Sequence, residues 1–201
     1  MSKLSIAGRS LLLLAISACW SLSQAEVTAE ALKQQIQERS GKIQEFRALL
    51  NDPDQTVRLA ALDVMLKSDD IAMRELAYGM GFNSADEAMR AVSLKNKFAD
   101  QQMISVKISA IASPSDSQKK ALGDWGGIYS FNVKGFDDKT GQFTTAGSYR
   151  KGTGQLNGTR MEFSQNYCNG TFQLGDGAML AGELGCTGGW AGTYAGQISL
   201  Q

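Results

Sequence analysis

The sequence of 201 residues contains no histidine. Without imidazole, Ser-His-Asp and Cys-His catalysis, histidine-based acid–base catalysis and nearly every common zinc site are excluded. Charge of one sign is not concentrated either, because 20 Lys and Arg stand against 20 Asp and Glu. Nucleic-acid affinity comes largely from clustered basic residues, so we expect no nucleic-acid partner. Carboxylate-based hydrolysis remains as a catalytic option, but these absences favour a protein that is not an enzyme and has no cofactor and no metal.

Long apolar runs are also missing. The apolar run from Leu11 to Trp20 is about ten residues long, which is too short to span a bilayer, since a membrane helix needs roughly 20. Lys3 and Arg9 precede this run, and small residues follow it up to Ala25. Residues 1–25 therefore predict a secretory signal peptide. We expect a periplasmic or secreted protein without a transmembrane segment.

Only three cysteines are present. Cys19 follows Ile-Ser-Ala, which resembles the lipobox of bacterial lipoproteins. Two interpretations stay open: cleavage after Ala25, or lipidation of Cys19, which would make the protein an outer-membrane lipoprotein. In an oxidising compartment the remaining pair, Cys168 and Cys186, predicts a disulfide. Its short loop gives about 3 kcal/mol of stabilisation in the chain-entropy model.

Glycine is distributed unevenly, since 18 of the 22 glycines lie beyond residue 122. Residues 26–101 are rich in good helix formers and predict a helical domain. Residues 102–122 predict a strand, Met103–Ile111, and a linker. Residues 123–201, rich in Gly, Thr and aromatic residues, predict a small antiparallel β meander, sandwich or barrel. The expected fold class is therefore α+β.

The helical segment contains an internal repeat with a step of 16 residues. Each unit can hold one helix of about 12 residues and a turn, with its apolar positions on one face. Ser84 and Glu87 have the spacing of a capping box and predict a helix start. The repeated positions are Asp54, Asp70 and Asp86; Arg58, Arg74 and Arg90; Val57, Met73 and Met89; Ala61, Ala77 and Ser93; Leu62, Tyr78 and Leu94; and Leu66, Phe82 and Phe98.

The stretch LLNDPDQTVRLAALDVML, residues 49–66, resembles the second half of a HEAT-type repeat. The resemblance covers about residues 44–99 and implies an interaction scaffold without catalytic activity. For the repeated acids and bases, one interpretation is an Asp at each helix start, paired with the Arg four residues later. The alternative is that Arg58, Arg74 and Arg90 form a ladder that binds a ligand.

In the β segment, turn sequences delimit six or seven strands. Asn157-Gly158 and Gly175-Asp176-Gly177 predict hairpins, and the disulfide would link the two arms of the second hairpin near its open end. The pattern W-x-G-x-Y occurs twice, at residues 125–129 and 190–194. We expect the first and last strands of this module to pair, because pairing would remove the exposed sheet edges.

Five aromatic residues are candidates for a platform on which sugar rings stack: Trp125, Tyr129, Tyr149, Trp190 and Tyr194. The competing interpretation is that these side chains fill the core of the β domain.

Acidic residues supply two weaker candidate sites. Asp137 and Asp138 lie in a predicted hairpin loop, where they either bind calcium or form a solvated turn. Glu162 and Glu183 lie on predicted strands, and paired carboxylates are what glycoside hydrolysis requires. Neither pair has a spacing that marks it as a site.

The sequence favours a non-enzymatic binding or interaction protein of the bacterial cell envelope, with a protein as its partner. A carbohydrate-binding module is the first alternative, based on the aromatic residues. An inhibitor or immunity protein that acts against an envelope-acting toxin or enzyme is the second.

Overall fold

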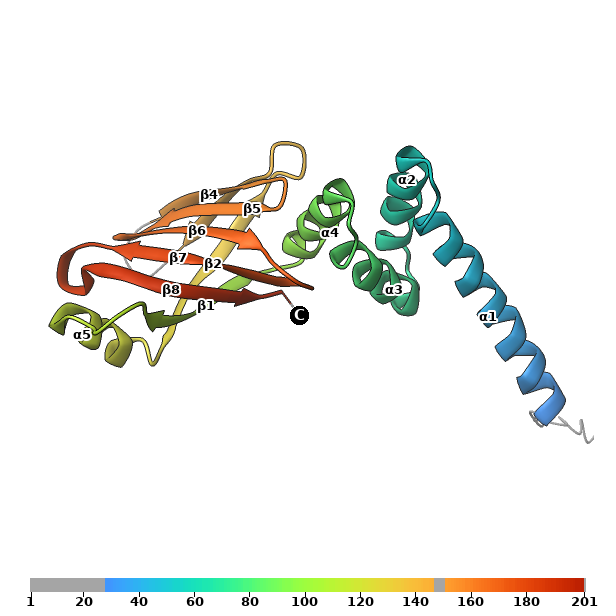
Figure 1. The fold of residues 1–201 in the computed structure, drawn as a ribbon, viewed down its shortest axis with the longest axis horizontal. Coiled ribbons are helices and arrows are strands. Elements are labelled where there is room, and N and C mark those ends of the chain that lie inside the picture. The colour runs from blue at the N-terminus through green and yellow to red at the C-terminus, as the bar shows by residue number, and fades with distance from the viewer. Residues whose placement is uncertain (1–27, 147–150, 201) are drawn as a thin grey trace, which may run out of the picture. The chain divides into compact units, whose positions relative to one another are not determined.

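The computed structural model describes residues 28–146 and 151–200 (Figure 1). The chain divides after Arg39 into two compact units. The described residues form five α-helices and a closed barrel of eight strands, which confirms the α+β fold class. The helices are α1 (Ala29–Leu50), α2 (Gln55–Leu66), α3 (Ile71–Phe82), α4 (Glu87–Ala99) and α5 (Asp116–Asp124), with a 3₁₀ turn η1 (Gly188–Trp190).

In the first unit, the described residues before Ser40 belong almost entirely to α1 and are exposed on every side. Leu32 and Ile36 keep 49% and 60% of their surface accessible to solvent. None of the helices among residues 28–146 and 151–200 is both long enough and apolar enough to cross a membrane.

The repeat of 16 residues corresponds to three successive helices, α2, α3 and α4. Asp54, Asp70 and Asp86 are their N-caps, and each carboxylate accepts a hydrogen bond from the backbone N–H two residues later. The prediction that Ser84 caps α4 is wrong, because Ser84 Oγ accepts from the backbone N–H of Asp86, which is the cap itself. Asp86 occupies the N-cap position because its carboxylate reaches the first turn of α4, where the helix dipole favours a negative charge.

The repeated apolar positions form the core of this helical part. Leu62, Leu94 and Phe98 are fully buried. A side chain on Gly81 would overlap Ser93 of the neighbouring helix, so the small residues at this level allow α3 and α4 to approach closely. The resemblance to HEAT repeats stays a prediction.

The three repeated arginines have different partners. Arg58 forms its ion pair with Asp86, at 2.6 Å, and not in the predicted way with the cap of its own helix. Arg74 donates to the carbonyl oxygen of Ser68. Arg90 donates to the carbonyl oxygens of Leu174 and Gly175 in the barrel. The arginines therefore connect parts of the protein to one another.

The eight strands follow one another around the barrel in chain order. Strand β1 pairs with both β2 and β8 and closes the sheet. The prediction that the first and last strands of the β module pair is therefore wrong. These strands, β2 and β8, follow the two W-x-G-x-Y tryptophans, and β1 lies between them. The strands are β1 (Met103–Ala110), β2 (Ile128–Phe136), β3 (Gln142–Ala146), β4 (Lys151–Asn157), β5 (Arg160–Gln165), β6 (Cys168–Leu174), β7 (Met179–Cys186) and β8 (Gly192–Ser199).

Aromatic rings fill the barrel. One inward-facing row runs Phe143, Gly154, Phe163 and Gly170 across β3 to β6. A side chain on Gly154 would overlap the ring of Phe143, and one on Gly170 would overlap the rings of Phe163 and Phe172. Each glycine thus provides the space that a neighbouring ring occupies, and Phe163 stacks on Phe172 with 5.9 Å between ring centroids.

Helices α4 and α5 lie at opposite ends of the barrel (Figure 1). At one end, Phe98 of α4 packs on Phe143, with 4.7 Å between ring centroids. At the other end, Gln118 of α5 donates to the carbonyl oxygen of Thr193. Helix α5 was not expected, because the sequence from Ala112 to Ser117 predicts a loop; its N-terminus is fixed by a capping box between Ser115 and Gln118.

The predicted disulfide joins Cys168 and Cys186. These two residues are direct cross-strand neighbours on β6 and β7. Both are buried, so the bond closes the open end of this hairpin inside the barrel, beside α5 and the two tryptophans.

Candidate functional site

A pocket of about 580 Å³ lies at the barrel end next to α5. It is called the aromatic pocket below. Aromatic rings and polar side chains from α5, β2, the turn between β5 and β6, and η1 surround it. Its lining residues are Met103, Asp124, Trp125, Tyr129, Ser130, Phe131, Asn132, Ala146, Asn166, Tyr167, Cys168 and Trp190.

The two W-x-G-x-Y motifs meet at this pocket. The rings of Trp125 and Trp190 lie 5.2 Å apart between centroids, and both side chains are half-buried. Trp190 Nε1 donates to the carboxylate of Asp124 at 3.1 Å. Lys120 forms an ion pair with the same carboxylate, and these two donors, Lys120 first, lower the pKa of Asp124. Asp124 at the end of α5 therefore anchors the indole N–H of Trp190, whose ring contacts Trp125.

Tyr129 and Tyr194 lie beneath the tryptophans and belong to the core. Only 6% of Tyr129 and none of Tyr194 is exposed. Burial raises the pKa of Tyr129 to about 12 and also raises that of Tyr194. The hydroxyl of Tyr129 donates to the carbonyl oxygen of Gln165, and that of Tyr194 to the carbonyl oxygen of Trp190. These tyrosines support the pocket from below and leave little ring surface for a ligand.

The turn between β5 and β6 contributes the exposed aromatic side of the pocket. Tyr167 is 45% exposed, and its carbonyl oxygen accepts from the backbone N–H of Thr187 at 2.9 Å. Asn166 precedes it with a φ of 56°, a left-handed conformation that asparagine tolerates better than most residues. Tight turn geometry therefore sets the position of an exposed aromatic residue that lines the same pocket as the two tryptophans.

The composition of the aromatic pocket limits what it can bind. Ring faces of Trp125, Trp190 and Tyr167 offer apolar, polarisable surface. Asn132, Asn166 and Asp124 offer hydrogen-bond donors and acceptors at the same place. A small set of polar groups beside aromatic surface is the usual composition of a site for a small polar ring.

Other predicted site residues have different fates. Cys19, the predicted signal peptide and Tyr149 lie outside the described residues. Asp137 accepts from the backbone N–H of Lys139 at 2.8 Å, and this bond lowers the pKa of Asp137. Within the described ranges, no group of three or more His, Cys, Asp or Glu residues is arranged to hold a metal ion.

Glu162 and Glu183 lie on the outer surface of the barrel, both exposed. They belong to one cross-strand row in which Thr171 on β6 separates them. Glu162 forms an ion pair with Arg160 at 2.6 Å. The two carboxylates thus share a face without converging on a cleft.

The structure brings together four of the five predicted aromatic residues. The sequence did not predict four other residues that line the pocket: Tyr167, Asn166, Asn132 and Asp124. The only sequence feature that pointed to Tyr167 is its place directly before the disulfide cysteine Cys168. Comparison with protein-family models, with curated proteins and with solved structures finds no match to this chain.

Proposed function

We propose that the protein is an exported, non-enzymatic binding protein of the bacterial cell envelope and that its barrel binds a carbohydrate in the aromatic pocket. The observation that carries the proposal is the contact between Trp125 and Trp190 in a pocket that the exposed residue Tyr167 also lines. Sugar rings present apolar C–H faces and a rim of hydroxyl groups. Aromatic rings next to amide and carboxylate groups complement both features.

Two observations support export and the absence of catalysis. A buried disulfide between Cys168 and Cys186 is typical of proteins that fold in an oxidising compartment. The carboxylates of Glu162 and Glu183 are exposed on the outer wall and do not converge, whereas glycoside hydrolysis needs two carboxyl groups that flank one bond. Asp124, the acid in the aromatic pocket, accepts from Lys120 and Trp190 through one oxygen, Oδ2, and the described lining of this pocket contains no second carboxylate.

The proposal is tested by isothermal titration calorimetry of the mature protein against a panel of oligosaccharides. Tyr167→Ala removes an exposed ring at little cost to the fold, and we expect it to weaken binding about two- to tenfold, the loss of one aromatic contact of about 0.5–1.5 kcal/mol. Tyr167→Phe keeps the ring and should keep the affinity. Val64→Ala, another exposed apolar truncation on α2, serves as the control. Equal affinity of wild type and Tyr167→Ala for every ligand that binds would contradict the proposal.

A protein partner for the helical part is the second candidate. This candidate is favoured because α1 exposes Leu32 and Ile36, which lie one turn apart on the same side of the helix. Chemical cross-linking in envelope extract, compared between wild type and a Leu32→Gln/Ile36→Gln variant, tests it. Loss of a specific cross-linked protein in the variant supports this role, and an unchanged set of products contradicts it.

A further inference from the structure

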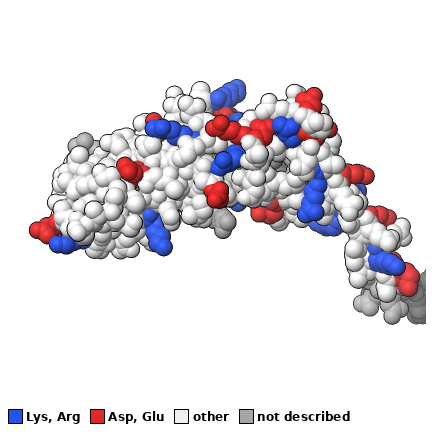
Figure 2. All heavy atoms as spheres, viewed as in Figure 1, with Lys and Arg blue, Asp and Glu red and all other residues white. Residues whose placement is uncertain are grey.

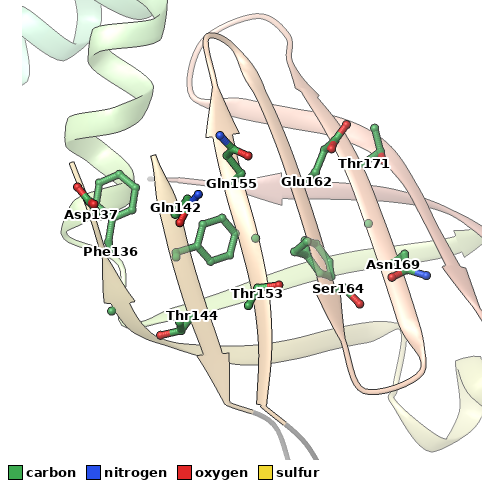
Figure 3. Close-up of a pocket in the computed structure, with 15 residues that line it drawn as sticks. Phe136, Asp137, Gln142, Thr144, Thr153, Gln155, Glu162, Ser164, Asn169 and Thr171 are labelled. Atoms are coloured by element: carbon green, nitrogen blue, oxygen red, sulfur yellow. The ribbon is translucent and has the colours of Figure 1, made fainter. Parts of the chain in front are cut away.

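A second depression, of about 890 Å³, lies on the outer wall of the barrel over β3, β4, β5 and β6 (Figure 3). It is called the polar groove below. Its side chains form two cross-strand rows, which the strand register defines. One row runs Gln142, Gln155, Glu162 and Thr171, and the other runs Thr144, Thr153, Ser164 and Asn169.

The floor between the two rows is low because the residues at that level face inward. Gly154 and Gly170 occupy the level between the rows on alternate strands, and Phe143 and Phe163 occupy the same level on the other two. All four face inward, so the outer wall at this level is bare backbone. A ligand that lies along the groove therefore meets polar side chains on both sides.

Few charged side chains line the groove: its described lining contains two acids, Asp137 and Glu162, and no base. Glu162 is paired with Arg160, and the other acid that lines the groove, Asp137, accepts hydrogen bonds from its own turn. The remaining side chains in the two rows are hydroxyl and amide groups, which both donate and accept. In Figure 2, charged residues are sparse over the barrel and dense over the helices. A neutral ligand with many hydroxyl groups complements this surface better than an ionic one.

The spacing of the rows suggests the form of the ligand. Neighbouring strands lie about 4.8 Å apart, so each row presents a polar side chain at about that interval. A β-1,4-linked sugar chain advances by a similar distance with each ring. A chain that crosses the strands would therefore place successive rings over successive strands, each within reach of one side chain from each row.

The polar groove adjoins the aromatic pocket along β3, where Ala146 lines the pocket and Thr144, two residues away, lines the groove. Residues two apart on a strand share a face and lie about 7 Å from each other.

We propose that the ligand is a linear, neutral, β-linked polysaccharide, with one ring stacked in the aromatic pocket and the following rings lying across β3, β4, β5 and β6 in the polar groove. This inference rests on the proposed function. It adds that binding depends on chain length and that Thr153, Ser164 and Asn169 contact rings beyond the first.

The test is calorimetric titration of the mature protein with β-1,4-linked glucose and N-acetylglucosamine oligosaccharides of one to about six rings. The affinity of the wild type should rise at least tenfold from two rings to five and then level off. Thr153→Val with Asn169→Ala should remove most of that rise and leave the affinity for the shortest ligand unchanged. Gln197→Ala, on the outer face of β8, is the control and should behave as the wild type.

The outcomes separate the two proposals. Binding that does not depend on chain length, or a rise that survives in the groove variant, overturns this inference and leaves the aromatic pocket as a site for a single ring. Absence of binding at every length, in the wild type as well, overturns the proposed function and this inference with it.

Discussion

Arg90 of α4 donates from Nη2 to the carbonyl oxygen of Gly175 at 2.6 Å, at the turn that follows β6. The equivalent arginine of the preceding repeat, Arg74, donates to a carbonyl oxygen just before its own helix. The arginine at this repeated position therefore stabilises a helix start in one 16-residue repeat. In the next repeat it attaches the helices to the barrel. Glu87, near Arg90 on α4, reinforces the attachment by accepting from the hydroxyl of Thr159 at 3.1 Å.

Arg90→Ala should lower the free energy of unfolding by about 2 to 3 kcal/mol, because charge-assisted hydrogen bonds are lost and two carbonyl groups are left without their donor. Chemical denaturation measures the change. Arg160→Ala, which removes an exposed ion pair, should cost less than about 1 kcal/mol. Similar losses for both variants would show that Arg90 does not hold the two parts together.

Gly154→Ala should destabilise the barrel by about 1 to 3 kcal/mol or more, the range for overpacking a core. Its Cβ would lie within 3.0 Å of the Phe143 ring. The matched control is Gly185→Ala on β7, where an added Cβ meets nothing within 4 Å. Thermal unfolding of the two variants measures the contrast. A double variant with Phe143→Leu should recover part of the loss, and no recovery would mean that the ring is not the obstacle.

Replacing Cys168 and Cys186 with alanine should cost about 3 kcal/mol, the value of the chain-entropy model for a loop of this size. The sequence separation is 18 residues. Circular dichroism should still report a β-rich fold, because the strands around the bond remain paired. Unfolding midpoints of the variant and of the oxidised wild type give the difference, and coincident curves would contradict the prediction.

The free energy of unfolding depends on pH through the carboxyl group of Asp86. Its ion pair with Arg58 lowers the pKa of this carboxyl in the folded protein, so the pair contributes fully above the ordinary pKa of about 3.9. The contribution is lost as the pH falls below that value towards the folded pKa. Asp86→Asn should therefore be less stable than wild type at pH 7, with a difference that shrinks below about pH 4.

Denaturation curves from pH 3 to 7 test this expectation. Asp116→Asn is the control, because the carboxylate of Asp116, which pairs with Lys119, is fully exposed to solvent. A constant difference between Asp86→Asn and wild type over the whole range would exclude the carboxylate charge as its cause.

Local patterns predicted a large part of the fold. The step of 16 residues located α2, α3 and α4, because each unit begins with a capping aspartate such as Asp54 and buries the same positions. The spacing of Cys168 and Cys186 about a turn sequence located their hairpin. These predictions succeeded because the deciding interactions lie within one helix or one hairpin.

Features that depend on distant partners were not predicted. The seam of the barrel depends on β1 lying between β2 and β8, and the sequence of Met103–Ala110 carries no sign of which strands it joins. The partner of Arg90 is 85 residues away along the chain. The two polar rows of the groove become visible only when the register between strands is known, because a shift of one residue turns every side chain to the other face.

The seam between β1 and β8 has a consequence for how the chain acquires its structure. Lys107 pairs with Gln197, so all the other strands are synthesised between the two partners. Pairing over such a distance in sequence is slow, and until it occurs β1 presents unpaired N–H and C=O groups to any strand nearby. We expect the open eight-stranded sheet, before β1 and β8 pair, to be the species most prone to aggregate, and a chaperone that covers this edge should raise the yield of refolded protein.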